Sequence, residues 1–395
     1  MLKKENIVFL LFSVVSIVIG LITTYLLSNY FSIEDFGKIQ FLLTLIGIGT
    51  MFYLSGFDIT IQKQIFNKND EIVKYVIKNI MPFSLALLVT TATILSIYLE
   101  KDIDLILYAA MVLAVGLFDK SNAILNSKLL FKQLRYLELF ARLALLVLAV
   151  FSIFYTHSVE VYFMIFTIIS MFILLFRINF TKRFLDLENK KQIDYKDVKK
   201  EGVETTLSSS YGILANWSER LILGILDTNL LAIFVIGQLF PKVIKDNVKI
   251  ILIPTLNVWA SKGFEHYTDM IKKYSLTLWL IGFTMYIIIY FMVDIIISNF
   301  FIKYEDSILI AQLLSITLIF KFIENIKMSS MALSKHTNIF NRINNISNTL
   351  KVILVVSLIP LYEIYGAVMA ILIVESLRFL LITIEYNKLT KGTVR

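Results

Sequence analysis

Stretches of about twenty apolar residues recur along the whole chain and are separated by short polar breaks. A helix of that length crosses the hydrocarbon core of a bilayer, so the pattern predicts an all-α polytopic membrane protein. Apolar windows bounded by charged and turn residues predict about twelve transmembrane helices, at 7–27, 39–61, 79–99, 103–125, 137–156, 161–180, 203–226, 230–256, 276–298, 307–331, 345–360 and 364–386.

The longest polar break, residues 181–204, lies midway and leaves six expected spans on each side. We therefore expect an N-terminal six-helix lobe (1–181), a cytoplasmic linker (182–202) and a C-terminal six-helix lobe (203–395). A tight polar turn joins the first two expected helices of each lobe, at "LLSNYFSIEDFGKIQ" and "ILGILDTNLLAIFVI". This topological match is typical of a parallel repeat.

Composition supports the membrane assignment, because 57% of the residues are hydrophobic and only 17% are charged. The chain has no cysteine, which excludes disulfides, thiolate metal sites and cysteine nucleophiles. His157, His266 and His336 fall in separate expected loops, so no metal site is expected. No glycine-rich phosphate loop is present either, and we expect no cofactor beyond coupling to a proton or sodium gradient.

The basic residues give an orientation. If both termini are cytoplasmic, 24 of the 38 lysines and arginines lie in expected cytoplasmic segments. Only Lys38, Lys101 and Lys303 lie in expected outer turns, and the others fall within the expected spans. This bias follows the positive-inside rule and predicts a multi-pass protein with both termini in the cytoplasm. It also accounts for the net charge of +8 without a nucleic-acid partner.

The stretch "FPKVIKDNVKIILIPTL" places three lysines inside an expected span. Lys242, Lys245 and Lys249 fall within an arc of about 60° on a helix. Facing lipid, they would together cost on the order of 7–10 kcal/mol. They are therefore expected to face water, acidic partners or an anionic ligand, and Pro241 and Pro254 suit a helix that lines a wet cavity. The alternative places the stretch at the cytoplasmic interface, with its lysines among headgroups.

Other ionisable and aromatic residues extend this candidate site. Arg220, in "SSSYGILANWSERLILGIL", is expected to continue the lysines into a cationic track. Glu219 and Glu324 are candidate ion-coupling carboxylates. A second set of candidate cavity residues comprises Arg142, Lys321, Asn216, Trp217 and Tyr211, of which Trp217 and Tyr211 would either stack on sugar rings or simply pack.

The remaining intramembrane charges have local explanations. Spacing predicts pairing of Glu138 with Arg142, of Glu375 with Arg378, and a triad of Lys321, Glu324 and Lys327. Three further basic residues lie near expected cytoplasmic helix ends and are predicted to extend toward the headgroups: Lys120, Arg177 and Lys351.

Three stretches resemble bacterial polysaccharide-repeat-unit (Wzx-type) flippases. "LLSNYFSIEDFGKIQFLLTLIGIG…LSGFDITIQKQI" is similar to their opening, with a Ser-x-E-x-F-G turn and a small-Gly-hydrophobe-Asp ending. "NWSERLILGIL" resembles their seventh helix, and "FFIKYEDSILIAQLLSIT" resembles the entry to their tenth. The resemblance places the chain in the multidrug/oligosaccharidyl-lipid/polysaccharide exporter (MOP) superfamily.

The resemblance implies two six-helix lobes around a central basic cavity that opens alternately to each side. It also implies transport of undecaprenyl-pyrophosphate-linked oligosaccharides to the outer leaflet of a bacterial inner membrane, for O-antigen, capsule or exopolysaccharide. We expect a monomer that works beside a polysaccharide polymerase and other assembly proteins, not an enzyme. A multidrug exporter of the same superfamily is the first alternative; a polymerase, a glycosyltransferase or a scaffold without transport fits less well.

Overall fold

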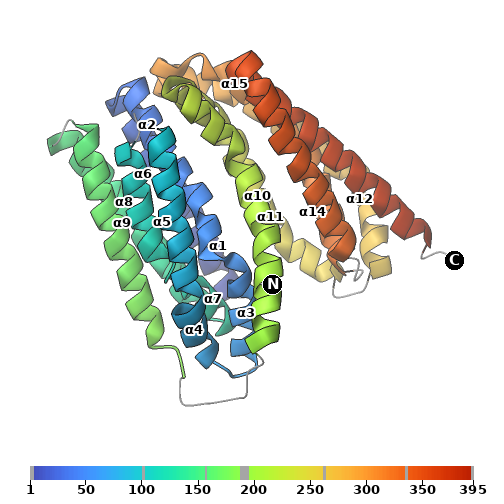
Figure 1. Cartoon of the computed structure of the whole chain (residues 1–395). Helices are drawn as coiled ribbons and strands as arrows, with labels where there is room; N and C mark the ends of the chain where they lie inside the picture. Colours follow the sequence, from blue (N-terminus) through green and yellow to red (C-terminus); the bar gives the residue numbers. More distant parts are fainter. Residues whose placement is uncertain are drawn as a thin grey trace. The chain divides into compact units, whose positions relative to one another are not determined.

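The computed structural model describes residues 4–99, 103–155, 158–186, 195–260, 264–333 and 337–392. Within these ranges, the side chains of residues 4–11, 13, 246–260, 264–265, 329–333, 337–338, 340 and 391–392 are not described. The described residues form helices joined by short turns (Figure 1). They divide into two compact units, unit 1 (Met1–Trp217) and unit 2 (Ser218–Arg395).

Unit 1 contains α1 to α9 and the first part of α10. The elements are α1 (Lys4–Tyr30), α2 (Ile33–Gly49), η1 (Thr50–Tyr53), α3 (Ser55–Phe66), α4 (Glu71–Tyr75), η2 (Val76–Ile80), α5 (Met81–Tyr98), α6 (Ile103–Gly116), α7 (Ser121–Ser127), α8 (Phe131–Tyr155), α9 (Val159–Lys182) and α10 (Tyr195–Leu226). Helix α1 packs on α8, α2 on α6, and α3 on α7, while α6 and α8 both pack on α9.

Local sequence explains how these helices start and break. Ser32 caps α2 by accepting a hydrogen bond from the Asp35 amide at 3.0 Å, and Glu34 and Asp35 favour the positive end of the helix dipole. Leu54, with a φ of 51°, separates η1 from α3. The turn that precedes Pro82 has π geometry, which accommodates a proline ring that would clash with an α-helical carbonyl.

Unit 2 contains the rest of α10 and five later helices. They are α11 (Thr228–Ala260), α12 (Phe264–Phe300), α13 (Ser307–Ser315), α14 (Thr317–Leu333) and α15 (Thr337–Gly392), with the short η4 (Ile302–Tyr304) before α13. Helix α12 packs on α14, α11 on α13 and α14, and α14 on α15. Tyr267, Ile271, Phe322 and Ile326 contribute to its buried apolar core.

The twelve predicted spans all fall on helices, but several of them are broken. Among the described residues, eight helices are long and apolar enough to cross a membrane. The predicted span 103–125 is divided into α6 and α7, and 307–331 into α13 and α14. The predicted spans 345–360 and 364–386 are the two arms of α15, which is broken at Glu363 with φ 49° and ψ −126°. The protein is a multi-span, all-helical membrane protein, and the number twelve stays a prediction.

Along the chain, the boundary between the two compact units falls within α10, after Trp217, and not in the polar segment predicted as a linker. Helix α10 already begins at Tyr195, and its first half packs closely on α3 of unit 1. Ser55 and Ser209 share a hydrogen bond of 2.7 Å there. The lobe boundaries at 181 and 203 therefore stay a prediction.

Candidate functional site

The polar residues of unit 2 follow helical stripes. On α11, Gln238, Lys242 and Lys245 are spaced four and three residues apart, and on α14 Lys321 and Glu324 are three apart. Such spacings place side chains on one helix face. On α15, Asn344 and Lys351 are two turns apart on one face. Three helices thus each present a polar face within a largely apolar unit.

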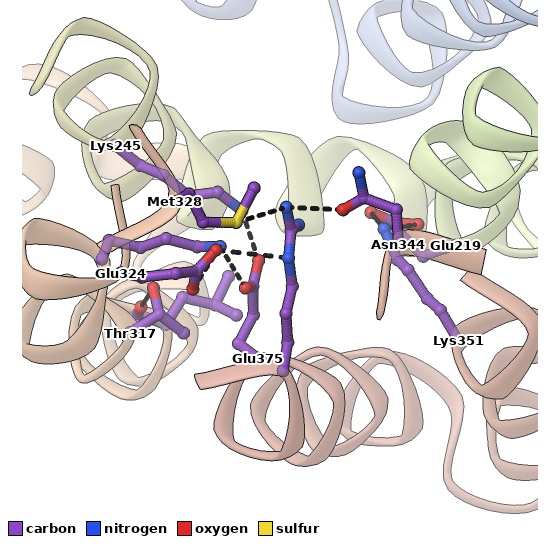
Figure 2. Close-up of polar contacts among 11 residues, drawn as sticks. Glu219, Lys245, Thr317, Glu324, Met328, Asn344, Lys351 and Glu375 are labelled. Atoms are coloured by element: carbon purple, nitrogen blue, oxygen red, sulfur yellow. Dashed lines mark hydrogen bonds and ion pairs between the residues drawn. The ribbon is translucent and has the colours of Figure 1, made fainter. Parts of the chain in front are cut away.

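One ion-pair network joins α11, α14 and α15 (Figure 2). Glu375 accepts from Lys245 Nζ at 2.7 Å and also pairs with Lys321. Lys321 Nζ lies 2.9 Å from Glu324 Oε1, and Glu324 in turn pairs with Arg378 at 3.2 Å. These contacts bury charges from three helices in one place, which we call the Glu375 network (Lys245, Lys321, Glu324, Glu375 and Arg378).

A second pair lies beside it. Lys351 Nζ is 3.0 Å from Glu219 Oε2, joining α15 to α10 (Figure 2). The guanidinium of Arg378 donates to Asn344 Oδ1 at 3.0 Å, on the same helix face as Lys351. Arg220, which follows Glu219 on α10, donates from Nε and Nη2 to Gln238 Oε1, at 3.2 and 2.9 Å. The polar stripe of α11 is thereby linked to α10.

The described side chains of this region carry an excess of positive charge. Three carboxylates, Glu219, Glu324 and Glu375, are accompanied by six basic side chains: Arg220, Lys242, Lys245, Lys321, Lys351 and Arg378. Ammonium and guanidinium groups supply the counter-charge and the hydrogen-bond donors that an anion requires, so an anion is the kind of ligand that this region suits.

Three of the four main predicted site residues lie in this region. Lys245 belongs to the Glu375 network, Arg220 contacts Gln238, and Lys242 is half-buried between them along α11. Of the three surroundings expected for these lysines (water, acidic partners or an anionic ligand), Lys245 has an acidic partner, Glu375. Lys249 lies on the helical backbone of α11, but its side chain is outside the described residues, as is that of Asp246.

The other candidates are divided between the two units. Lys321, Glu324 and Glu219 are buried in unit 2. In unit 1, the Trp217 indole lies directly against Gly47 of α2, which favours packing over sugar stacking. Asn216 is exposed and Tyr211 is half-buried. Arg142 donates to the Ser16 carbonyl at 3.1 Å and so connects α8 to α1.

The local pairing predicted from spacing is only partly found, and Glu138 is paired with a different residue of its own helix. Arg135, not Arg142, contacts Glu138, at 2.5 Å. Glu375 contacts lysines of α11 and α14, whereas Arg378 contacts Glu324 of α14 and Asn344 of α15, and Lys327 donates to Thr383 Oγ1 at 3.0 Å. Only the Lys321–Glu324 part of the triad is confirmed.

The three residues predicted to extend toward headgroups are paired inside the protein instead. Lys351 binds Glu219, as described above. Lys120 is buried and lies 3.0 Å from Asp58 Oδ1, while Arg177 Nε lies 3.0 Å from Asp119 Oδ2. Each of them has a carboxylate partner from another part of the chain: Asp58 of α3, Glu219 of α10, and Asp119 in the turn between α6 and α7. Such a partner compensates a buried charge. The Asp58 of "LSGFD" was visible as a motif ending, although its partner was not.

The fold is that of an all-helical, multi-pass membrane protein. The chain belongs to the Polysaccharide biosynthesis protein family, whose model matches residues 2–236. No curated protein matches the chain in sequence.

Solved structures show the same fold. The lipid II flippase MurJ in an inward closed conformation is similar over 96% of this chain and 87% of that chain, with a TM-score of 0.68 and 18% identity. An inward-facing multidrug resistance MATE family transporter of the MOP superfamily gives 0.66 and 14%, over 95% of this chain and 96% of that one. A Vibrio cholerae MATE transporter, VcmN, gives 0.59 and 12%, over 98% and 96%.

Proposed function

We propose that the protein is a flippase that moves undecaprenyl-pyrophosphate-linked oligosaccharide repeat units from the cytoplasmic to the outer leaflet, for surface polysaccharide synthesis. The observation that carries the proposal is the excess of basic side chains over carboxylates among the described side chains of the polar stripes of unit 2. Lysine and arginine supply both counter-charge and hydrogen-bond donors to phosphate oxygens. Membership of the polysaccharide biosynthesis family supports a glycan-linked substrate.

In this proposal twelve spans form two six-helix lobes, and alternating access exposes the basic residues to each side in turn. Arg220, Lys242, Lys245 and Lys249 hold the pyrophosphate while the isoprenoid tail stays in lipid. An ion gradient supplies the bias, because one charge crossing 100 mV releases about 2.3 kcal/mol. Glu219 and Glu324 stay candidate ion carriers; a proton on either must compete with the basic partners described above.

The MATE-like fold supports a multidrug exporter as the second candidate. Organic cations require acidic sites, whereas the charge excess here is positive, so the flippase is favoured. A polymerase or glycosyltransferase would require catalytic side chains outside the lipid core. Drug sensitivity of a deletion strain separates the two transport functions, since the flippase predicts no change in drug resistance.

The test is the leaflet in which lipid-linked oligosaccharide accumulates after deletion of the gene. We expect the lipid-linked oligosaccharide to accumulate in the inner leaflet of the deletion strain. Wild type and Lys245→Arg should restore its transport to the outer leaflet, and Lys245→Ala should restore it poorly. Lys272→Ala is the matched control, because Lys272 is an exposed lysine of the same unit outside the polar stripes. Accumulation in the outer leaflet, or full restoration by a combined Lys245→Ala and Lys249→Ala variant, would contradict the proposal.

A further inference from the structure

Glu375 holds together two ammonium groups that come from two other helices. Its Oε1 accepts from Lys245 of α11 at 2.7 Å (Figure 2). Its Oε2 pairs with Lys321 of α14. Only 12% of its side chain is exposed. A carboxylate bridging two lysines in this way uses the donors that a phosphate group would use.

The two lysines differ in how well a ligand can reach them. The Lys245 side chain is 34% exposed, whereas that of Lys321 is 6% exposed and has a second carboxylate, Glu324. Glu324 itself is held between Lys321 and Arg378 and is only 2% exposed. An incoming anion can therefore displace Glu375 from Lys245, while the Lys321–Glu324–Arg378 part stays intact.

We propose that Glu375 is an internal counter-ion that competes with the anionic substrate for Lys245, and so sets which anions the site accepts. This rests on the proposed function. Competition with Glu375 weakens the binding of every anion by the same factor, because the state in which Lys245 is available to a ligand is only partly populated. A phosphodiester headgroup carries one negative charge and a pyrophosphate carries more. The weakly bound phosphodiester headgroups of the abundant phospholipids then leave the site empty, whereas the more strongly attracted pyrophosphate still occupies it.

The experiment measures binding of inorganic pyrophosphate and of dimethyl phosphate, a singly charged phosphodiester, to the purified full chain in detergent. Glu375→Gln removes the competing charge at nearly constant volume. We expect its dissociation constants for both anions to fall by about tenfold or more, the scale of coupling between close charge pairs. In Lys245→Ala/Glu375→Gln this gain should disappear, because the contested ammonium group is gone.

Glu324→Gln is the matched control, because it removes one negative charge from the same network without touching Lys245. We expect it to leave the affinity for pyrophosphate unchanged or weaker, since Glu375 then remains as the partner of Lys321. Equal tightening in Glu324→Gln and Glu375→Gln would show a general charge effect and overturn the inference.

Other outcomes separate this inference from the proposed function. If wild type binds pyrophosphate through Lys245 and Glu375→Gln binds it no better, the inference fails and the proposed function stands. If no variant binds pyrophosphate, both fail. Should Glu375→Gln not yield folded protein, Glu375→Asp serves instead: its shorter side chain cannot hold both lysines, so tighter binding is expected and unchanged binding overturns the inference.

Discussion

Lys120 of unit 1 is buried where η1, α3 and the start of α7 meet. Its ammonium group contacts Asp58 Oδ1 at 3.0 Å and donates to the Tyr53 carbonyl at 2.7 Å. The side chain is only 1% exposed, so its hydration is replaced by these two partners. A buried pair of this kind stabilises little in total, but loss of one partner leaves an uncompensated charge.

Lys120→Met should therefore destabilise the protein by about 3–5 kcal/mol, and Asp58→Asn/Lys120→Met should recover much of that loss. The measurement is the thermal unfolding midpoint in detergent for both single variants and the double variant. Lys63→Met is the matched control, because the Lys63–Glu201 pair is largely exposed and is worth less than about 1 kcal/mol. Equal midpoints for Lys63→Met and Lys120→Met would contradict this account.

Charges at membrane depth could be predicted from the sequence, but most of their partners could not. Helical spacing finds neighbours on one helix, and it identified the Lys321–Glu324 contact. Asp58 and Lys120, or Lys245 and Glu375, are brought together only by packing between helices. For the same reason the sequence named Lys245 as a candidate and dismissed Glu375, the residue that Lys245 contacts.

At the scale of elements, the break in α15 determines how its two arms can pack. Glu363 reverses the chain, and a Cβ placed on Gly366 would lie 2.3 Å from the Leu358 carbonyl oxygen. The arms therefore approach each other closely at this turn, which only a glycine permits. Pro360 and the polar residues nearby predicted a boundary here, and the boundary between the expected spans was correctly placed. The breaks at Leu54 and Ile316 were not predicted, because neither residue is a proline or a glycine.

Gly366→Ala gives a test in which two effects have opposite sign. By helix propensity alone, alanine should stabilise the arm by up to about 1 kcal/mol. The contact with Leu358 instead predicts destabilisation of roughly 1–3 kcal/mol, as for other overpacked positions. Unfolding midpoints of the variant and wild type decide between them, and a raised midpoint would contradict the close approach. Glu363→Gly is the companion variant, expected to be tolerated because its φ of 49° suits glycine.

At the scale of the whole molecule, hydropathy predicted the fold class and the family resemblance was correct, as the family match and the MurJ-like fold show. What hydropathy could not settle is how broken helices such as α6–α7 and α13–α14 cross the bilayer. Length and apolar content identify eight candidate crossings among the described residues. One of them, Ser307–Met328, runs across the break between α13 and α14, and another, Asn341–Thr390, covers both arms of α15, whereas neither α6 nor α7 is long enough to be a candidate by itself.

The natural absence of cysteine allows the twelve-span topology to be tested directly. Tyr98 is exposed at the outer end of the predicted span 79–99, and Glu305 is exposed in a predicted outer turn. Lys132 and Lys196 are exposed in predicted cytoplasmic segments. Each of the four is replaced by a single cysteine. We expect a membrane-impermeant maleimide to label the first two from outside intact spheroplasts and the last two only after permeabilisation. Wild type is the unlabelled control, and glycan output should verify that each variant is active. The Tyr98 and Lys132 sites test whether α6 and α7 together cross the membrane, because one site precedes α6 and the other follows α7. If both sites are labelled from the same side, these two helices do not cross the membrane and the count of twelve spans is wrong.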